Sequence, residues 1–322
     1  MLQFLGENYI ETAMVMKPNR IQTDLRAPPG RYFKERLIQG ILFTCGFLAI
    51  VITVITIWIF ISGSGIFFRA VPLREFLGGI RWAPTDIATP TYGALPLIVG
   101  TLIIMGIALI VAVPIGLLSA IYLSEFASER LRKVAKPILE ILAGIPTVVY
   151  GYVALLFITP LLRTVLPDIQ FWNALSAGVA LGIAIIPLVS SLSEDIIYAV
   201  PRELREGSYA LGATKFETIR YVVLPAALSG IAAAVILAMS RAIGETMIVA
   251  IAAGRIPTWP PDLLRPLQTL TVHIVNVATG DAEAGAFIWA TIFAVGALLF
   301  AITMVLNILS YMIVRRFREQ YE

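Results

Sequence analysis

Six segments of this sequence are long and apolar enough to cross a membrane, and they constrain the fold more than any other feature. A helix needs about 20 predominantly apolar residues to span the hydrocarbon core of a bilayer. The segments cover residues 37–62, 94–123, 138–162, 172–200, 222–253 and 284–314. Only 14% of the residues are charged, whereas soluble domains carry about 25%. The sequence therefore predicts an all-α polytopic membrane protein with six transmembrane helices.

The uneven distribution of basic residues predicts the orientation, because cytoplasmic loops are enriched in Lys and Arg. Of the 24 Lys and Arg residues, 17 lie in the N-terminal tail, the loops after the second and fourth segments, and the C-terminus. Six lie in the other loops. Both termini are therefore expected to face the cytoplasm. Residues 1–36 are expected to form a flexible tail whose basic residues contact anionic lipid, followed by a transmembrane domain over residues 37–322.

Several function classes lack the residues that they need. Cys45 is the only cysteine and His273 the only histidine, which argues against a disulfide, a zinc cluster or a histidine-rich metal site. No segment matches the phosphate-binding loop of ATPases, so a separate chain would have to hydrolyse any ATP that drives this protein. An inverted repeat typical of secondary transporters and a polar catalytic cluster are not apparent. We therefore expect no metal, no bound cofactor and no catalytic residue on this chain.

The loop after the fourth segment, VPRELREGSYALGATKFETIRYVVLPAALSG (200–230), predicts a short helix-turn-helix over about residues 201–220. Pro201 is suited to a helix start, because its missing N–H would be unpaired in a first turn anyway. Gly212 permits the turn, KFETIR is expected to form a second short helix, and Pro225 to mark the return to the bilayer. An ordinary surface linker is the alternative.

The spacing in this loop resembles a motif of permease subunits of bacterial ABC importers: Glu, five residues, Gly, nine residues, Ile, one residue, Leu-Pro. Here Val222 stands at the isoleucine position, and small residues follow the glutamate. The resemblance implies a coupling helix that sits in a groove of an ATPase subunit. The residues to which it assigns this role are Glu206, Gly212, Ala213, Leu224 and Pro225.

Three further stretches resemble the phosphate-specific ABC importer, and in particular its PstC-type permease. They are IYLSEFASERLRKVAKPILEILAGIPTVVYGYVAL (121–155), YGALPLIVGTL (92–102) and SRAIGETMIVAIAAG (240–254). The resemblance implies the ABC type I importer permease fold in a bacterial inner membrane, with inorganic phosphate as substrate. It also implies a second homologous permease, two ATPase subunits that use ATP, and an extracytoplasmic phosphate-binding protein; no nucleic-acid partner is expected. A permease for another oxyanion, such as sulfate or molybdate, is the alternative.

Arg241 and Glu245 lie inside the fifth apolar segment, where an arginine costs about 2.5–3.5 kcal/mol on insertion scales. Being four residues apart, the two side chains are expected to share a helix face and to be able to pair. The functional interpretation is that Arg241 attracts the substrate oxyanion, because a guanidinium presents a planar fork of donors. Glu245 would then keep the anion from binding too tightly. The family resemblance implies the same two residues in phosphate passage.

The third segment contains AGIPTVVYG (143–151), in which Gly144 and Pro146 are expected to interrupt the helix. Such breaks occur in membranes where the freed backbone faces protein or a water-filled cavity. Thr147 and Tyr150 would then offer hydroxyls to a translocation path. The alternative is that the glycine and proline serve helix packing and that the hydroxyls bond to backbone.

Two other groups of residues have plainer expected roles. Glu194 and Asp195 lie near the cytoplasmic end of the fourth segment, where interfacial water is expected to solvate them. Trp82 and Trp259 lie in the two larger extracytoplasmic loops. They are interpreted either as interfacial anchors or as part of a docking surface for an external partner.

Overall fold

The computed structural model describes residues 29–86, 88–280 and 287–317, so most of the predicted N-terminal tail lies outside the described residues. The chain divides into two units, Met1–Trp58 and Ile59–Glu322. The described chain is mostly helical. Its one sheet there is a two-stranded antiparallel ribbon of β1 (Trp82–Ala83) and β2 (Thr91–Tyr92).

Five runs of helix are long and apolar enough to cross a membrane, and a sixth span arises if one bent pair is counted. The prediction of an all-α polytopic fold is therefore confirmed. The five runs are Glu35–Ala70 of α3 (Pro29–Ala70), α5 (Leu95–Ile121) with η1 (Tyr122–Phe126), α9 (Ala174–Tyr198), α11 (Lys215–Thr218) with η3 (Ile219–Val223) and α12 (Leu224–Gly244), and Ile288–Met312 of α15 (Ile288–Phe317). The shorter helices are α4 (Leu73–Gly78), α10 (Arg202–Ala210), α13 (Met247–Ala252) and α14 (Leu270–Ala278).

The bent pair lies at the third apolar segment and confirms the predicted interruption at Gly144 and Pro146. α6 (Glu129–Ala143) ends there, and α7 (Thr147–Val153), η2 (Ala154–Ile158) and α8 (Thr159–Arg163) continue at an angle of 86°. Pro146 lacks an N–H and disfavours helix in the residue before it, so the two helical stretches can take different directions.

Two π-helical turns allow prolines inside long helical runs. A proline ring clashes with the carbonyl four residues before it. In η2 and η3 the residue before the proline instead donates its N–H to the carbonyl five residues earlier, Thr159 to Ala154 and Leu224 to Ile219. The chain therefore stays helical from Lys215 through Pro225 to Gly244. The predicted separate second helix, with a return to the bilayer marked at Pro225, is wrong in this respect.

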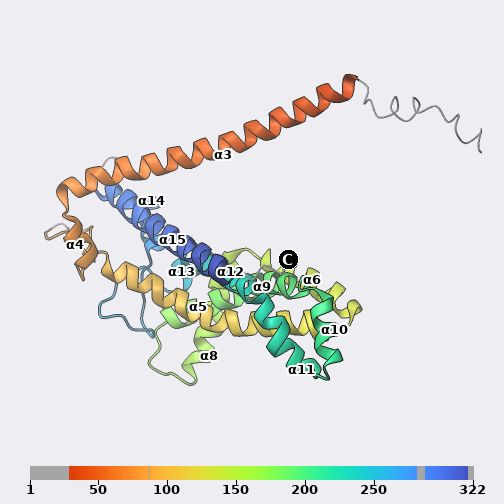
Figure 1. Cartoon of the computed structure of the whole chain (residues 1–322). Coiled ribbons are helices and arrows are strands. Elements are labelled where there is room, and N and C mark those ends of the chain that lie inside the picture. Colours follow the sequence, from red (N-terminus) through yellow and green to blue (C-terminus); the bar gives the residue numbers. More distant parts are fainter. Residues whose placement is uncertain (1–28, 87, 281–286, 318–322) are drawn as a thin grey trace, which may run out of the picture. The chain divides into compact units, whose positions relative to one another are not determined.

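The centre of the second unit is the packing of α5 against α9, through small residues. A Cβ atom on Gly178 would lie 2.6 Å from Cβ of Ile107, and one on Gly182 would lie 2.7 Å from Cβ of Val111. The two glycines are four residues apart, the spacing that lets membrane helices approach closely. Alanines of both helices fill the same core. Within this unit, α10 and α11 lie at one end, and α4 and α14 lie at the other (Figure 1).

Candidate functional site

The loop assigned to coupling forms a compact hairpin whose turn depends on Gly212. The N–H of Gly212 donates to Tyr209 O at 2.9 Å, and the N–H of Ala213 donates to Ser208 O at 3.2 Å. This is the Schellman arrangement, with Gly212 in the left-handed region at φ 84°. A capping box between Thr214 and Glu217 then starts α11. The predicted helix-turn-helix is thus present, and Leu211 at its tip is 90% exposed.

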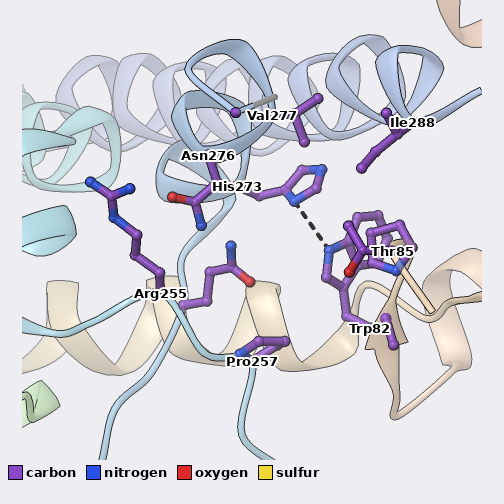
Figure 2. A pocket seen from close by; sticks show the side chains of 12 residues that line it. Trp82, Thr85, Arg255, Pro257, His273, Asn276, Val277 and Ile288 are labelled. Atoms are coloured by element: carbon purple, nitrogen blue, oxygen red, sulfur yellow. Dashed lines mark hydrogen bonds between the residues drawn. The ribbon is translucent and has the colours of Figure 1, made fainter. Parts of the chain in front are cut away.

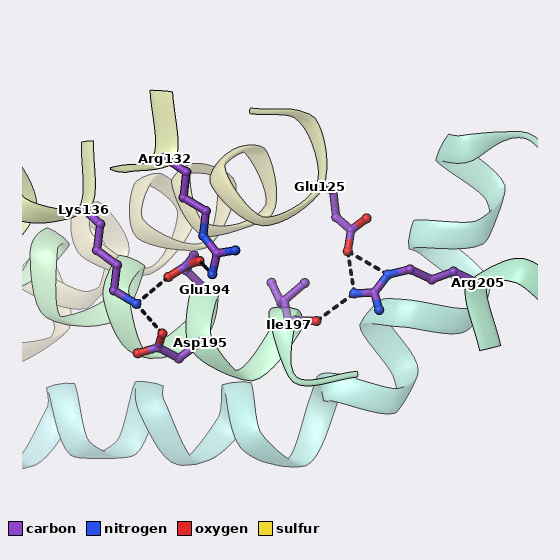
Figure 3. A network of polar contacts seen from close by, with 7 residues as sticks. All are labelled: Glu125, Arg132, Lys136, Glu194, Asp195, Ile197 and Arg205. Atoms are coloured by element: carbon purple, nitrogen blue, oxygen red, sulfur yellow. Dashed lines mark hydrogen bonds and ion pairs between the residues drawn. The ribbon is translucent and has the colours of Figure 1, made fainter. Parts of the chain in front are cut away.

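The base of this hairpin is held by Arg205, a residue that the sequence analysis did not single out. Its guanidinium donates to Glu125 Oε1 at 2.8 Å and to the carbonyl of Ile197 at 2.9 Å (Figure 3). Ser208 and Thr218 bond to each other at 2.9 Å and join α10 to α11. Glu206 is exposed. Leu224 and Pro225 begin α12, which continues the chain from the hairpin through η3. The hairpin is therefore joined to η1 and α9 by these hydrogen bonds and to α12 through the chain.

Glu194 is buried and ion-paired, so the expectation that water solvates it is wrong. Its side chain is 2% exposed and contacts both Arg132 and Lys136 of α6, the latter at 3.0 Å (Figure 3). Lys136 also pairs with Asp195, which is half exposed as expected. Arg132 and Lys136 are four residues apart on α6, so both cations reach the same end of α9. Two cations four residues apart, in the segment before the one that carries the adjacent acids Glu194 and Asp195, are the sequence signal that could have predicted these ion pairs.

The fifth apolar segment contains a second break, and this overturns the expected pairing of Arg241 with Glu245. α12 ends at Gly244, and Glu245 has an extended backbone with φ −66° and ψ 131°. The carboxylate of Glu245 accepts the N–H groups of Met247 at 3.0 Å and Ile248 at 3.3 Å, so it caps α13. Within the described ranges, Arg241 forms no ion pair, and its side chain is exposed. Residues four apart share a face only within one continuous helix, and here the helix ends between Arg241 and Glu245.

The broken third segment packs directly against this second break. A Cβ atom on Gly151 of α7 would lie 3.0 Å from Cβ of Ile251 on α13. The hydroxyl of Tyr150 donates to Leu142 O at 3.1 Å, which is the backbone contact that the alternative interpretation expected. Thr147 is half-buried in the first turn of α7. The structure thus brings the four candidate path residues to two adjacent helix breaks.

The opposite end of the unit is organised around the buried His273. Trp82 Nε1 donates to His273 Nδ1 at 3.2 Å (Figure 2). His273 Nε2 lies 2.9 Å from the Thr291 hydroxyl. This arrangement fits a neutral imidazole with its proton on Nε2. Burial lowers the pKa of His273 to about 4. Trp82 is only 4% exposed, so its interpretation as an interfacial anchor is wrong, whereas Trp259 is 39% exposed.

A cavity of about 340 Å³ adjoins this cluster and is lined by Arg255, Gln268 and Asn276 as well as His273 (Figure 2). In the part of the chain that the structure describes, no three His, Cys, Asp or Glu side chains are grouped so that they could hold a metal ion. The contacts of His273 with Trp82 and Thr291 join α14 to β1 and α15.

Residues 112–319 match the family described as "Binding-protein-dependent transport system inner membrane component". The chain belongs to this family. This inner membrane component is 34% identical over 271 residues to the probable ABC transporter permease protein YqgH of Bacillus subtilis, covering 84% of this chain and 87% of the relative. It is 35% identical over 261 residues to the phosphate transport system permease protein PstC of Mesorhizobium japonicum, covering 75% and 78% of the two chains.

Solved structures support the fold of this inner membrane component. A bacterial alginate ABC transporter, solved in complex with an alginate pentasaccharide-bound periplasmic protein, contains a chain that superposes with a TM-score of 0.62. The match covers 90% of this chain and 99% of that one at 16% identity. The fold is that of an ABC type I importer permease, as predicted, and the chain is a transporter subunit.

Proposed function

We propose that this inner membrane component is one permease subunit of an ATP-driven importer of inorganic phosphate. The observation that carries the proposal is Arg241, an exposed guanidinium near the end of a long apolar helix with no carboxylate partner in the described chain. An unpaired charge in a membrane segment is costly and typically marks a substrate path. The 35% identity to the phosphate permease of Mesorhizobium japonicum supports phosphate as the anion.

The positions of Arg241 and Glu245 give the two charges different roles in anion transport. Arg241 stays protonated and can donate two parallel hydrogen bonds to a phosphate. Glu245 lies four residues after Arg241, and its carboxylate is fixed by the hydrogen bonds that cap α13. It therefore contributes a negative charge that does not cancel Arg241 but opposes tight anion binding, and an ion must be able to leave its site. Thr147 and Tyr150 complete this surface from α7.

The partners follow from the proposed function. A second homologous permease faces the exposed side of Arg241 and completes the path. Two ATPase subunits hydrolyse ATP, so this chain itself needs no bound cofactor, and one of them receives the hairpin through Glu206, Gly212, Ala213 and the exposed Leu211. A phosphate-binding protein delivers the anion to the end that carries α4 and α14. The chain then lies in the bacterial inner membrane with both termini in the cytoplasm.

Uptake in a strain depleted of its own phosphate importers tests the substrate. Expression of this chain with its partner permease, ATPase and binding protein should restore uptake of labelled phosphate. Excess unlabelled phosphate should abolish the signal, while sulfate and molybdate should leave it unchanged. Competition by sulfate or molybdate, with no effect of phosphate, would instead establish the alternative oxyanion.

A further inference from the structure

α6 carries an apolar stripe that no part of the described chain covers. None of its residues is buried, although it is a 15-residue helix with a Ser128 cap. Ile141 is 70% exposed and Val134 is 60% exposed. The exposed apolar residues recur at spacings of three and four, so they share one face of the helix. The stripe consists of Leu131, Val134, Ile138, Ile141 and Leu142.

The bend after α6 sets its direction relative to the membrane. If α7, η2 and α8 cross the bilayer, an angle of 86° places α6 close to the membrane plane. Helices in that position bury an apolar face at the boundary between headgroups and acyl chains and keep a charged face in water. The other side of α6 is occupied, because Arg132 and Lys136 reach Glu194 on α9.

The remaining charges of α6 are distributed as such a helix requires. Arg130 and Lys133 are exposed, and they form no ion pair within the described ranges. On a helical wheel Arg130 borders the apolar stripe, whereas Lys133 lies with Glu129 and Glu140 on the polar side of the helix. Arg130 is thus near the level of the headgroups, which its long side chain can reach. Glu129 and Glu140 are exposed on the side away from the stripe.

We propose that α6 is an in-plane helix that binds acidic phospholipid of the cytoplasmic leaflet, with the apolar stripe among acyl chains and Arg130 at the headgroup phosphates. The leaflet rests on the proposed function, through the orientation given above. The helix then fixes two functional elements at once. It holds the end of α9 next to the hairpin through Arg132 and Lys136, and it leads directly into the break before Thr147 and Tyr150.

Lipid fits this face better than a second protein does. A protein partner would have to cover the stripe and also supply acids for Arg130, whereas one acidic phospholipid supplies both acyl chain and phosphate. Basic residues at the cytoplasmic surface attract acidic lipids in this way. The rival occupant, the partner permease, is distinguished by the experiment.

The experiment uses the complete importer reconstituted in bilayers, with Cys45→Ser as background. A fluorophore on Ile138→Cys reports the stripe, and one on Glu129→Cys reports the opposite face. Brominated phosphatidylcholine and brominated phosphatidylglycerol quench a fluorophore that contacts acyl chains, and iodide quenches one in water. We expect lipid quenching at position 138 and iodide quenching at position 129. Protection of position 138 from both quenchers would show that the partner permease covers the stripe, and iodide quenching there would show that α6 lies in water; either result overturns the proposal.

Charge is tested with the same label. Quenching by phosphatidylglycerol should exceed that by phosphatidylcholine, and Arg130→Gln should reduce this preference about fivefold. Arg130→Lys should retain it, as should Arg74→Gln, which removes an exposed cation from α4 at the other end of the unit. An unchanged preference in Arg130→Gln would overturn the role of the headgroup. Because quenching does not require transport, lack of phosphate uptake by a complex with normal quenching would refute the proposed function and not this proposal.

Discussion

Glu194 and Arg241 are both charged residues in apolar helices, but their surroundings are opposite. Glu194 is 2% exposed and contacts two cations, Arg132 and Lys136. Arg241 is exposed and forms no ion pair in the described chain. The sequence had predicted a solvated Glu194, and it had allowed Arg241 either to pair with Glu245 or to attract the substrate. The difference teaches that a buried charge with all its partners supports the structure, whereas an exposed charge without a partner is available for a ligand.

Glu194→Gln should have the largest effect, because it leaves two cations beside a buried neutral group. Breaking a buried ion pair by removing one partner costs about 3–5 kcal/mol. We expect the purified permease complex to lose about that much stability against thermal or denaturant unfolding. Asp195→Asn is the matched control, because Asp195 is 55% exposed and such pairs contribute about 0–1 kcal/mol. Equal losses in the two variants would contradict the distinction between them.

Arg241→Gln should give the converse result, loss of transport with little loss of stability. Hydrogen bonds to a charged group contribute about 1.5–3 kcal/mol each, so we expect phosphate uptake to fall roughly 100-fold. The unfolding transition should barely move, since no intrachain ion pair is lost. Ser240→Ala is the control at the neighbouring position, where it removes a 2.9 Å hydrogen bond to Asn307 but no charge. A variant that fails to assemble would show that Arg241 is structural.

His273 is, like Glu194, a buried polar side chain with partners, and it lies at the opposite end of the unit. Its pKa is lowered by burial to about 4 from an ordinary 6.5, so the unfolded chain binds the proton first as pH falls. Stability is complete above about pH 6.5 and declines toward pH 4, with a loss of about 2 kcal/mol at pH 5. The difference between the free energies of unfolding at pH 7.5 and pH 5 measures this loss. His273→Gln should abolish this part of the pH dependence; a protein equally stable at both pH values would contradict it.

The sequence was sufficient for features that depend on length and local chemistry. Apolar length predicted the spans, and the glycine and proline at 144 and 146 predicted the bend. The turn at Gly212 followed from its freedom at positive φ. The loop spacing and the three longer stretches pointed to the family that residues 112–319 match.

Features that depend on tertiary contacts could not be predicted. The burial of Glu194 requires α6 to lie against α9, and the hydrogen bond of Trp82 joins residues 191 positions apart in the chain. Pro225 was expected to mark the return to the bilayer, but a π turn keeps the helix continuous. The break after Gly244 has no neighbouring proline from which it could be predicted. It is stabilised from α14 by Thr271, whose hydroxyl donates to Glu245 O at 2.9 Å.

Gly212→Ala tests the exposed hairpin, and its expected loss of stability is smaller than that of Glu194→Gln. A left-handed φ of 84° costs a residue with a Cβ about 1–2 kcal/mol, although no atom lies within 4 Å of the added Cβ. We expect the hairpin to shift, so that ATP hydrolysis by the complex no longer drives uptake. Gly207→Ala is the control, since Gly207 lies inside α10 in open space and alanine there should stabilise the helix by about 0.5–1 kcal/mol. If both variants transport normally, the hairpin does not carry the coupling.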